Sequence, residues 1–303
     1  MVSMEQVLTL TGAPDKRNVT DELLGRAADI LARAGAAVGA AKSLAPGVAV
    51  DLPYDGIDPA HAARAVRDGL PRASVDVNAQ SAGGRRKRLL VADMDSTLII
   101  GESLDELAEH AGIKKQIAAI TARAMRGELD FEDALKARVR MLKGLPDSAI
   151  EAVVNGLVLT DGAEALVATM KAAGAYCAVV SGGFTPMTRA IRDRLGCDED
   201  RSNRLDVADG VLTGRVVPPI LGGDAKLSAL NELVAALSID TSAAATVGDG
   251  ANDLAMLGAA GLGVAFRAKP AVKEAASFRI DHADLTGLLY LQGYRAAEIC
   301  YPV

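Results

Sequence analysis

The 303-residue chain contains no tryptophan, and aromatic residues make up only 3% of it. Its formal net charge is -6 at pH 7, so it has neither the basic surface nor the stacking rings on which nucleic-acid binding usually depends. We therefore exclude a nucleic-acid partner. No apolar run is long enough to cross a bilayer, and no basic segment followed by an apolar one opens the chain. We expect a cytoplasmic protein with no membrane partner.

Cysteine and histidine are also scarce, with three residues of each. Cys177, Cys197 and Cys300 are odd in number and widely spaced, a pattern that fits neither a disulfide framework nor a zinc site. The histidines lie far apart, and none belongs to a motif at the end of a predicted strand. A histidine-based catalytic triad is therefore not supported.

Two domains are expected, because 303 residues with 50% hydrophobic and 24% charged side chains can bury a large core. A polar stretch with two glycines at 79–87 is typical of a linker, which separates residues 1–78 from residues 88–303.

The first domain is predicted to have the order βαββαβ. Its expected elements are a strand at 6–10, a helix at 20–34, extended segments at 36–44 and 48–52, a helix at 58–70 and a strand at 73–77. This order indicates a ferredoxin-like α+β unit, which resembles the ACT domain in topology. The pattern leaves its role open between packing, a homodimer contact and amino-acid sensing.

The second domain opens with the apolar run Leu89–Ala92, which is typical of a buried parallel strand. Asp93 and Asp95 follow it, at the end of the strand where open α/β sheets bind ligands. Such a pair can bind Mg²⁺ or attack phosphorus, although an isolated D-x-D is also typical of a solvated turn. From 102 to about 157 the apolar spacing is helical, which predicts an inserted lid over the site.

Three later segments place further polar groups at strand ends or helix starts. A strand at 175–180 runs into Ser181-Gly182-Gly183, where a hydroxyl and free N–H groups suit a phosphate. Lys226 lies at the start of a predicted helix. The strand at 244–247 runs into 248–253, which contains Asp249 and Asp253.

Together these segments predict phosphoryl chemistry. Asp93 and Asp249 are candidate metal ligands, because carboxylate oxygens suit Mg²⁺. Ser181 and Lys226 are candidate phosphate-binding residues, and Asp95 is the candidate for moving protons.

With these motifs, the chain from about Arg88 onward resembles the haloacid dehalogenase (HAD) superfamily, and within it the phosphoserine phosphatases. The resemblance rests on Asp93–Thr97, Ser181–Phe184, Lys226 and Gly248–Asp253. Narrower support comes from Glu102, the run 124–131 and Arg138, which look like the substrate-selecting cap residues of that family. The resemblance implies a Rossmann-like doubly wound parallel sheet with a helical cap at about 103–157.

The resemblance also implies residue roles. Asp93 is expected to be the nucleophile that forms an aspartyl-phosphate, and Asp95 the general acid and base. Mg²⁺ would be bound by the Asp93 carboxylate, the Asp95 carbonyl and Asp249, with Asp253 supporting these ligands through hydrogen bonds. The residues implied to bind substrate are Glu102, Met125, Phe131, Arg138, Ser181, Gly182, Lys226 and Asn252.

The implied reaction is hydrolysis of O-phospho-L-serine to L-serine and phosphate, the last step of serine biosynthesis. Glu102 would face the ammonium group and Arg138 the carboxylate. Two alternatives remain open at this point: a HAD phosphatase or phosphotransferase for another small phosphorylated metabolite, and a non-enzymatic amino-acid-sensing scaffold.

Overall fold

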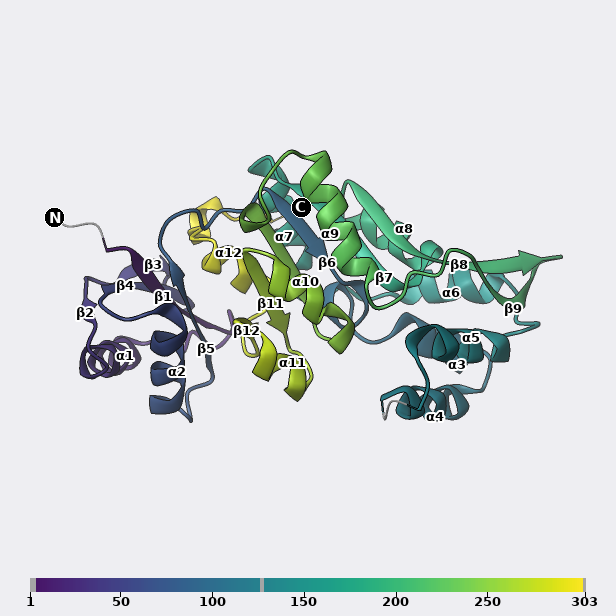
Figure 1. Ribbon diagram of the computed structural model, residues 1–303, viewed down its shortest axis with the longest axis horizontal. Coiled ribbons are helices and arrows are strands. Elements are labelled where there is room, and N and C mark those ends of the chain that lie inside the picture. The colour runs from purple at the N-terminus through teal and green to yellow at the C-terminus, as the bar shows by residue number, and fades with distance from the viewer. Residues whose placement is uncertain (1–3, 126–127, 302–303) are drawn as a thin grey trace.

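The computed structural model describes residues 4–125 and 128–301, whose strands form two β-sheets arranged along the long axis of the molecule (Figure 1). The N-terminal unit, at the left in Figure 1, comprises β1 (Gln6–Gly12), α1 (Asp21–Arg33), β2 (Ala37–Val38), β3 (Lys42–Ala45), β4 (Ala49–Asp55), α2 (Pro59–Gly69) and β5 (Val75–Ser81).

The sheet of the N-terminal unit has the strand order β2-β4-β1-β5, with β3 also paired to β4, and the pairings are antiparallel. Both helices begin at residues that cap them: Thr20 accepts a hydrogen bond from the Leu23 N–H, and Asp58 accepts one from the His61 N–H. The apolar faces of these helices and of the sheet share one core. This arrangement is that of a ferredoxin-like unit, in agreement with the predicted order.

Two details differ from the sequence-based expectation. The extended segment at 36–44 contains two short strands, β2 and β3, rather than one. In addition, β5 runs to Ser81, so the first three residues of the expected linker at 79–87 belong to a strand. The second difference has a tertiary cause, because residues 79–81 pair with residues 6–8 of β1 and the Gln80 side chain donates to the Leu291 carbonyl in the second unit.

Asp76, Asn78 and Gln80 supply polar contacts between the N-terminal unit and the second one; they alternate along β5 and therefore share one face. Asp76 is 4% exposed, and its carboxylate accepts three backbone N–H groups at distances of 2.6 to 3.1 Å. The Asn78 side chain donates to the Arg279 carbonyl and accepts the Arg279 N–H, and the Gln80 side chain donates to the Leu291 carbonyl. The backbone partners belong to Arg279, Asp281, His282, Ala283 and Leu291.

The second sheet has the order β12-β11-β10-β6-β7-β8-β9. Its strands are β6 (Leu89–Ala92), β7 (Tyr176–Phe184), β8 (Glu199–Ala208), β9 (Val211–Val217), β10 (Ala244–Gly248), β11 (Leu262–Phe266) and β12 (Phe278–Ile280). Adjacent strands are parallel except for β8 and β9. The chain order therefore reverses between β6 and β10, the point at which doubly wound sheets bind ligands.

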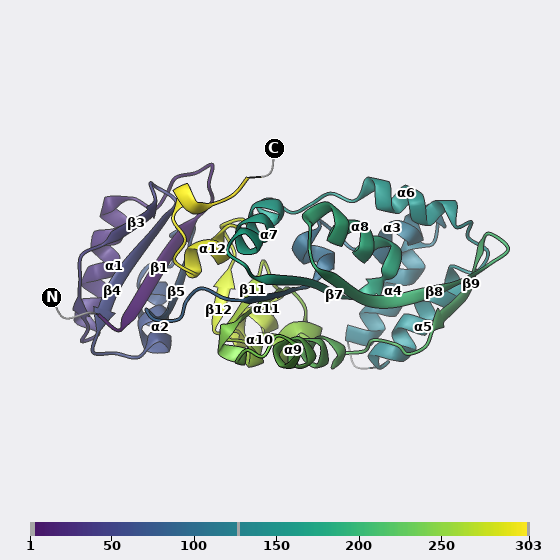
Figure 2. The same ribbon diagram turned by 90° about the horizontal axis from the view of Figure 1, so that it is seen from above.

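Helices cover both faces of this sheet, as Figure 2 shows from above. The buried apolar side chains of α7 (Ala163–Ala172), α8 (Thr185–Leu195) and α12 (Gly287–Leu291) belong to one core cluster. Those of α9 (Ala225–Ala236), α10 (Leu254–Ala259) and α11 (Pro270–Ala275) belong to another. This is the Rossmann-like core that the sequence predicts. Within the described residues, no helix is long and apolar enough to cross a membrane.

Between β6 and α7 the chain forms the helical cap, which consists of α3 (Ser103–His110), α4 (Lys114–Met125), α5 (Phe131–Met141) and α6 (Ser148–Gly156). The β8–β9 hairpin turns at Asp209 and Gly210, both with positive φ, as expected from a two-residue loop. Backbone hydrogen bonds connect the hairpin to the segment between α5 and α6. The Gly144 N–H donates to the Leu212 carbonyl, and the Asp147 N–H donates to the Gly210 carbonyl. The hairpin thus supports the cap from the sheet.

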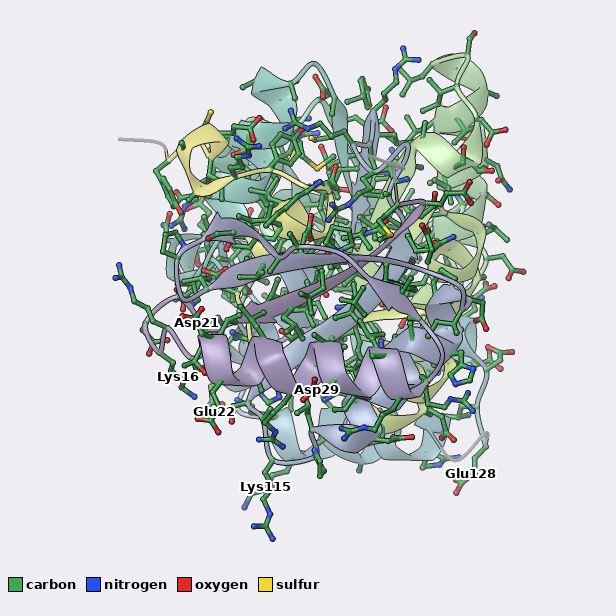
Figure 3. The ribbon with its side chains drawn as sticks, turned by 90° about the vertical axis from the view of Figure 1, so that its left-hand side faces the viewer. Lys16, Asp21, Glu22, Asp29, Lys115 and Glu128 are labelled. Carbon is green, nitrogen blue, oxygen red and sulfur yellow. The ribbon has the colours of Figure 1, made fainter. Side chains whose placement is uncertain are left out.

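Replacing Asp76 by Ala should lower the free energy of unfolding by about 3 kcal/mol, because it leaves buried N–H groups without an acceptor. Urea denaturation measures this quantity. The control is Asp29→Ala on the exposed side of α1 (Figure 3), which should change it by less than about 0.5 kcal/mol. Equal losses in the two variants would contradict the role given to Asp76.

Candidate active site

The candidate site lies at the switch point of the second sheet, where a cavity of about 380 Å³ opens between the strand ends and the cap. Asp93 directly follows β6 and Asp249 directly follows β10, so parallel pairing of these strands brings both carboxylates to one edge. Of the residues that the sequence predicts, those lining the cavity are Asp93, Asp95, Glu102, Phe131, Arg138, Ser181, Gly182, Asp249 and Asn252.

Lys226 lies beneath this cavity and is 3% exposed. Its ammonium group is 2.7 Å from the Asp93 carboxylate and 2.5 Å from the Asp253 carboxylate. The second oxygen of Asp253 accepts the Gly250 N–H at 2.9 Å. Both oxygens of Asp253 are therefore engaged, which agrees with a supporting role for this residue.

Burial controls the protonation of this cluster. It raises the pKa of the Asp93 carboxyl, and the charge of Asp253 adds to the effect while Lys226 opposes it. For Lys226 burial acts in the opposite direction, but Asp93 and Asp253 outweigh it and raise the pKa of the ammonium group. Lys226 thus stays charged and compensates one of the two carboxylates.

Glycine makes the close approach of these groups feasible at two positions. A β-carbon on Gly248 would lie 2.3 Å from the carboxyl carbon of Asp253, so a side chain there would displace the carboxylate. A β-carbon on Gly182 would lie 3.0 Å from the ring of Phe131 in the cap. The ring of Phe131 therefore lies against Gly182, near the end of β7.

Asp95 lies at the N-terminus of α3, the first cap helix. Its carboxylate accepts the Ser103 N–H at 2.7 Å and the Ser103 hydroxyl at 3.2 Å. Burial raises the pKa of Asp95, although the two hydrogen bonds from Ser103 oppose this. A carboxyl group with a raised pKa holds a proton closer to neutral pH, as a general acid requires.

Glu102 and Arg138 come from the cap and line the same cavity. The Ser96 hydroxyl donates to Glu102 at 2.9 Å. Burial and the negative charge of the nearby Asp95 raise the pKa of Glu102 to about 7. Burial lowers the pKa of Arg138, and the charges of Glu102 and Asp105 oppose that shift. The cap therefore brings one anion and one cation to the cavity.

At the end of β7, Ser181 is 3% exposed and its hydroxyl accepts the Gly183 N–H at 3.0 Å. Asn203 holds the backbone next to it, donating to the Gly182 carbonyl at 3.0 Å. The predicted residue Met125 ends α4, but its side chain lies outside the described part of the chain.

The donors present fit a divalent metal ion. Carboxylate oxygens of Asp93, Asp249 and Asp253 lie within 4.8 Å of one another, and all three residues are buried. Oxygen donors of this kind are those that Mg²⁺ and Ca²⁺ prefer. Lys226 compensates only part of their charge, which favours the addition of a cation.

The sequence-based prediction missed several residues of the cavity. It also missed Ser103, which does not line the cavity but donates two hydrogen bonds to Asp95; it could have been found as the residue that begins the cap helix, next to Glu102. Lys269 could have been noticed as a cation after β11, directly before Pro270. Asp105 and Thr121 also line the cavity, and no motif in the sequence points to them.

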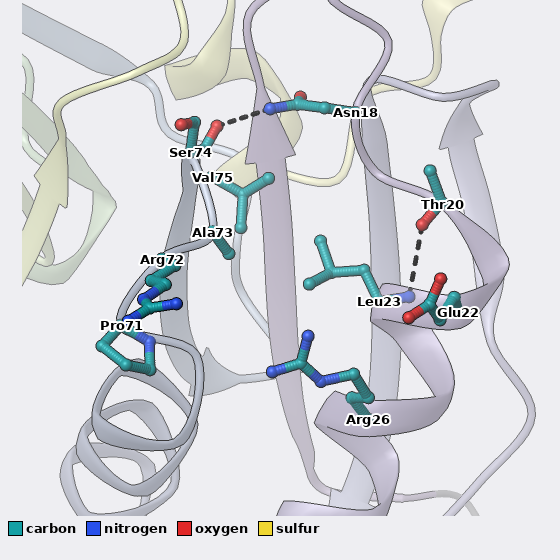
Figure 4. A pocket seen from close by; sticks show the side chains of 10 residues that line it. All are labelled: Asn18, Thr20, Glu22, Leu23, Arg26, Pro71, Arg72, Ala73, Ser74 and Val75. Carbon is teal, nitrogen blue, oxygen red and sulfur yellow. Dashed lines mark hydrogen bonds between the residues drawn. The ribbon is translucent and has the colours of Figure 1, made fainter.

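A second hollow, of about 540 Å³, lies in the N-terminal unit between α1 and the chain that leads into β5 (Figure 4). Glu22, Arg26 and Arg72 are its charged lining residues. The Asn18 side chain bonds to the Ser74 carbonyl at one end of it. It holds none of the predicted catalytic residues that the structure describes, so it is not the candidate reaction site.

A scan against family models matches residues 90–258 to the haloacid dehalogenase-like hydrolases. This match covers more than half of the chain, and the fold and the strand-end carboxylates agree with it. The chain belongs to this family.

Its curated relatives within the family include phosphoserine phosphatases. That of Streptomyces coelicolor is 43% identical over 256 residues, which is 84% of this chain and 62% of the relative. That of Methanocaldococcus jannaschii is 41% identical over 205 residues, which is 68% of this chain and 97% of the relative. This chain therefore spans about three fifths of the first relative, and it falls in the phosphoserine phosphatase branch of the family.

Among solved structures, a HAD family hydrolase from Salmonella enterica is similar over both sheets. The TM-score is 0.82 at 30% sequence identity, and the alignment covers 94% of this chain and 98% of that one. The fold of the N-terminal unit and of the core is thus shared with that hydrolase.

A divalent cation should stabilise the folded protein, because it binds the carboxylates of the native site. We expect millimolar MgCl₂ to raise the melting temperature by about 3 °C or more, as measured by differential scanning fluorimetry. Asp249→Asn should abolish this increase. Asp209→Asn, in the exposed hairpin turn, should retain it. An undiminished increase in the Asp249 variant would show that the ion binds elsewhere.

Proposed function

We propose that the protein is a Mg²⁺-dependent phosphoserine phosphatase that hydrolyses O-phospho-L-serine to L-serine and phosphate. The observation that carries this proposal is one cavity that holds two kinds of group. Asp93 and Asp95 suit phosphoryl transfer, while Glu102 and Arg138 suit the two charged ends of an amino acid. The similarity to curated phosphoserine phosphatases supports the same function.

Asp93 is the proposed nucleophile. One of its carboxylate oxygens forms a bond to phosphorus as the bond from phosphorus to the serine oxygen breaks, which leaves an aspartyl-phosphate. Asp95 donates a proton to the departing serine oxygen, so that L-serine leaves with a hydroxyl group rather than an alkoxide. Asp95 then accepts a proton from a water molecule, whose oxygen bonds to phosphorus as the bond from phosphorus to the Asp93 oxygen breaks; phosphate leaves and the Asp93 carboxylate is regenerated.

The proposed ligands of Mg²⁺ are the carboxylates of Asp93 and Asp249 and the main-chain carbonyl of Asp95, with Asp253 in support. When bound, the ion offsets the repulsion between the anionic phosphate and the carboxylate that attacks it. Ser181, the Gly182 N–H, Lys226 and Asn252 hold the phosphoryl oxygens in this proposal.

Substrate choice is assigned to the cap. Glu102 binds the ammonium group, and the planar guanidinium of Arg138 binds the carboxylate. Phe131 supplies an apolar cover, consistent with its approach to Gly182. A phosphate ester without the amino-acid groups would leave Glu102 and Arg138 without partners, so it should react slowly.

Several finer assignments stay predictions. These are the ACT-like character of the N-terminal unit, the division into domains at 1–78 and 88–303, a homodimer through the first domain, a cytoplasmic location and a place at the last step of serine biosynthesis. The carboxylate cluster at the switch point and the similarity to curated phosphoserine phosphatases favour the enzyme over an amino-acid-sensing scaffold.

Asp93→Asn should reduce release of phosphate from O-phospho-L-serine by at least about 1000-fold, because the amide is a poor nucleophile. Malachite-green detection of phosphate measures the rate, and circular dichroism verifies that the fold is intact. Asp209→Asn serves as the matched control with wild-type activity. Persistent turnover in the Asp93 variant would refute the nucleophile assignment, and an inactive wild-type chain would refute the enzyme.

Glu102→Gln should lower kcat/KM for O-phospho-L-serine by about 100-fold and leave that for a sugar phosphate unchanged. Since the pKa of Glu102 is about 7, the wild-type residue loses its charge as the pH falls through that value. The wild-type advantage over the variant should therefore shrink below about pH 7. The ratio of wild-type to variant kcat/KM at each pH is independent of substrate titration, because both enzymes meet the same substrate. Equal wild-type rates on phosphoserine and on a sugar phosphate would contradict the assigned substrate.

A further inference from the structure

The cavity at the switch point has an excess of acidic groups. Its described lining residues include five carboxylates, those of Asp93, Asp95, Glu102, Asp105 and Asp249, but only two cations, Arg138 and Lys269. Lys226 lies below them, engaged by two carboxylates. A phosphate dianion entering the cavity therefore needs additional positive charge from the protein, and the core side of the cavity offers it at Lys269.

Lys269 reaches the cavity from the loop that follows β11, the strand beside β10. Its ammonium group is 3.6 Å from the Asp249 carboxylate, and its side chain remains 51% exposed. It also attracts Glu102, so it lies within electrostatic reach of both ends of the cavity. The closer partner is Asp249, beside the nucleophile Asp93.

Backbone hydrogen bonds hold the loop that carries Lys269 against Asp249 and α11. The Lys269 N–H donates to the Asp249 carbonyl at 3.2 Å, and its own carbonyl accepts N–H groups at the start of α11. Arg267 has a φ of 42°, in the left-handed region, and its N–H donates to the Ile280 carbonyl at 2.7 Å. A strained turn of this kind returns the chain from β11 toward Asp249 and is typical of functional loops.

We propose that Lys269 is a further phosphate-binding residue, whose ammonium group contacts the substrate phosphate at the end of the cavity where Asp249 lies. This inference rests on the proposed function. Once a metal ion engages Asp249, that carboxylate no longer compensates Lys269, and the phosphate is the anion that takes its place. Arg138, on the cap beside Glu102, remains the partner of the amino-acid carboxylate.

Binding of inorganic phosphate tests the proposal directly. The full chain is titrated with phosphate in saturating MgCl₂ by calorimetry, as wild type and as Lys269→Gln, Lys269→Arg and Lys273→Gln. Lys273 is the matched control, since it lies one turn later on α11 and pairs with Asp281 at 2.6 Å. We expect Lys269→Gln to weaken phosphate binding about fivefold, and the Arg variant to retain affinity within about twofold. The control should match the wild type.

Inhibition by L-serine separates the two ends of the cavity. Lys269→Gln should leave the inhibition constant of L-serine unchanged while raising KM for phosphoserine. The proposal is overturned if the wild type does not bind phosphate, or if Lys269→Gln binds phosphate as tightly as Lys273→Gln does. It is also overturned if Lys269→Gln lowers the affinity for phosphate and the affinity for L-serine by the same factor. It is also overturned if only Mg²⁺ affinity falls, because Lys269 would then serve Asp249 alone.

The wild-type assay distinguishes this inference from the function on which it rests. If the wild type binds phosphate through Lys269 but does not hydrolyse phosphoserine, the substrate assignment fails and the phosphate-binding role stands. If the wild type hydrolyses phosphoserine and Lys269→Gln behaves as the control does, the function stands and Lys269 has no part in it.

Discussion

The structure depends on one buried charge cluster, in which the ammonium group of Lys226 lies between the carboxylates of Asp93 and Asp253. Removing such groups from water is costly, and the cost is offset only when each charge is paired at close range. Two carboxylates against one ammonium leave a net negative charge. That imbalance favours the binding of a cation, which the nearby carboxylate of Asp249 also suits.

The topology explains why this cluster forms at that place. β6 and β10 are far apart in the sequence but adjacent in the sheet, so the groups that follow them meet where the chain order reverses. The other residues that line the cavity then come from the end of β7, beside β6, and from the cap. Because Asp95 accepts the first N–H of α3, the cap is attached directly to the residue proposed to move protons.

The N-terminal unit is bound to this core by polar contacts of β5 and by apolar side chains of residues 44–49, which belong to the same buried cluster as α12. Three alternating side chains of β5 satisfy backbone groups at the end of β12 and beyond it. β12 pairs with β11, and the loop after β11 carries Lys269. The unit therefore holds the edge of the sheet from which one cation of the cavity projects.

The sequence by itself determined the local elements and the strand-end motifs. The apolar run before Asp93, the N-cap residue Thr20 of α1 and the turn at Asp209 are local patterns. Each can be recognised from a few neighbouring residues. Only the tertiary structure decided that β5 continues into the expected linker and that Lys269 reaches Asp249. Both depend on contacts between segments distant in the chain, because a side chain's partners are set by packing of the sheet and not by its sequence neighbours.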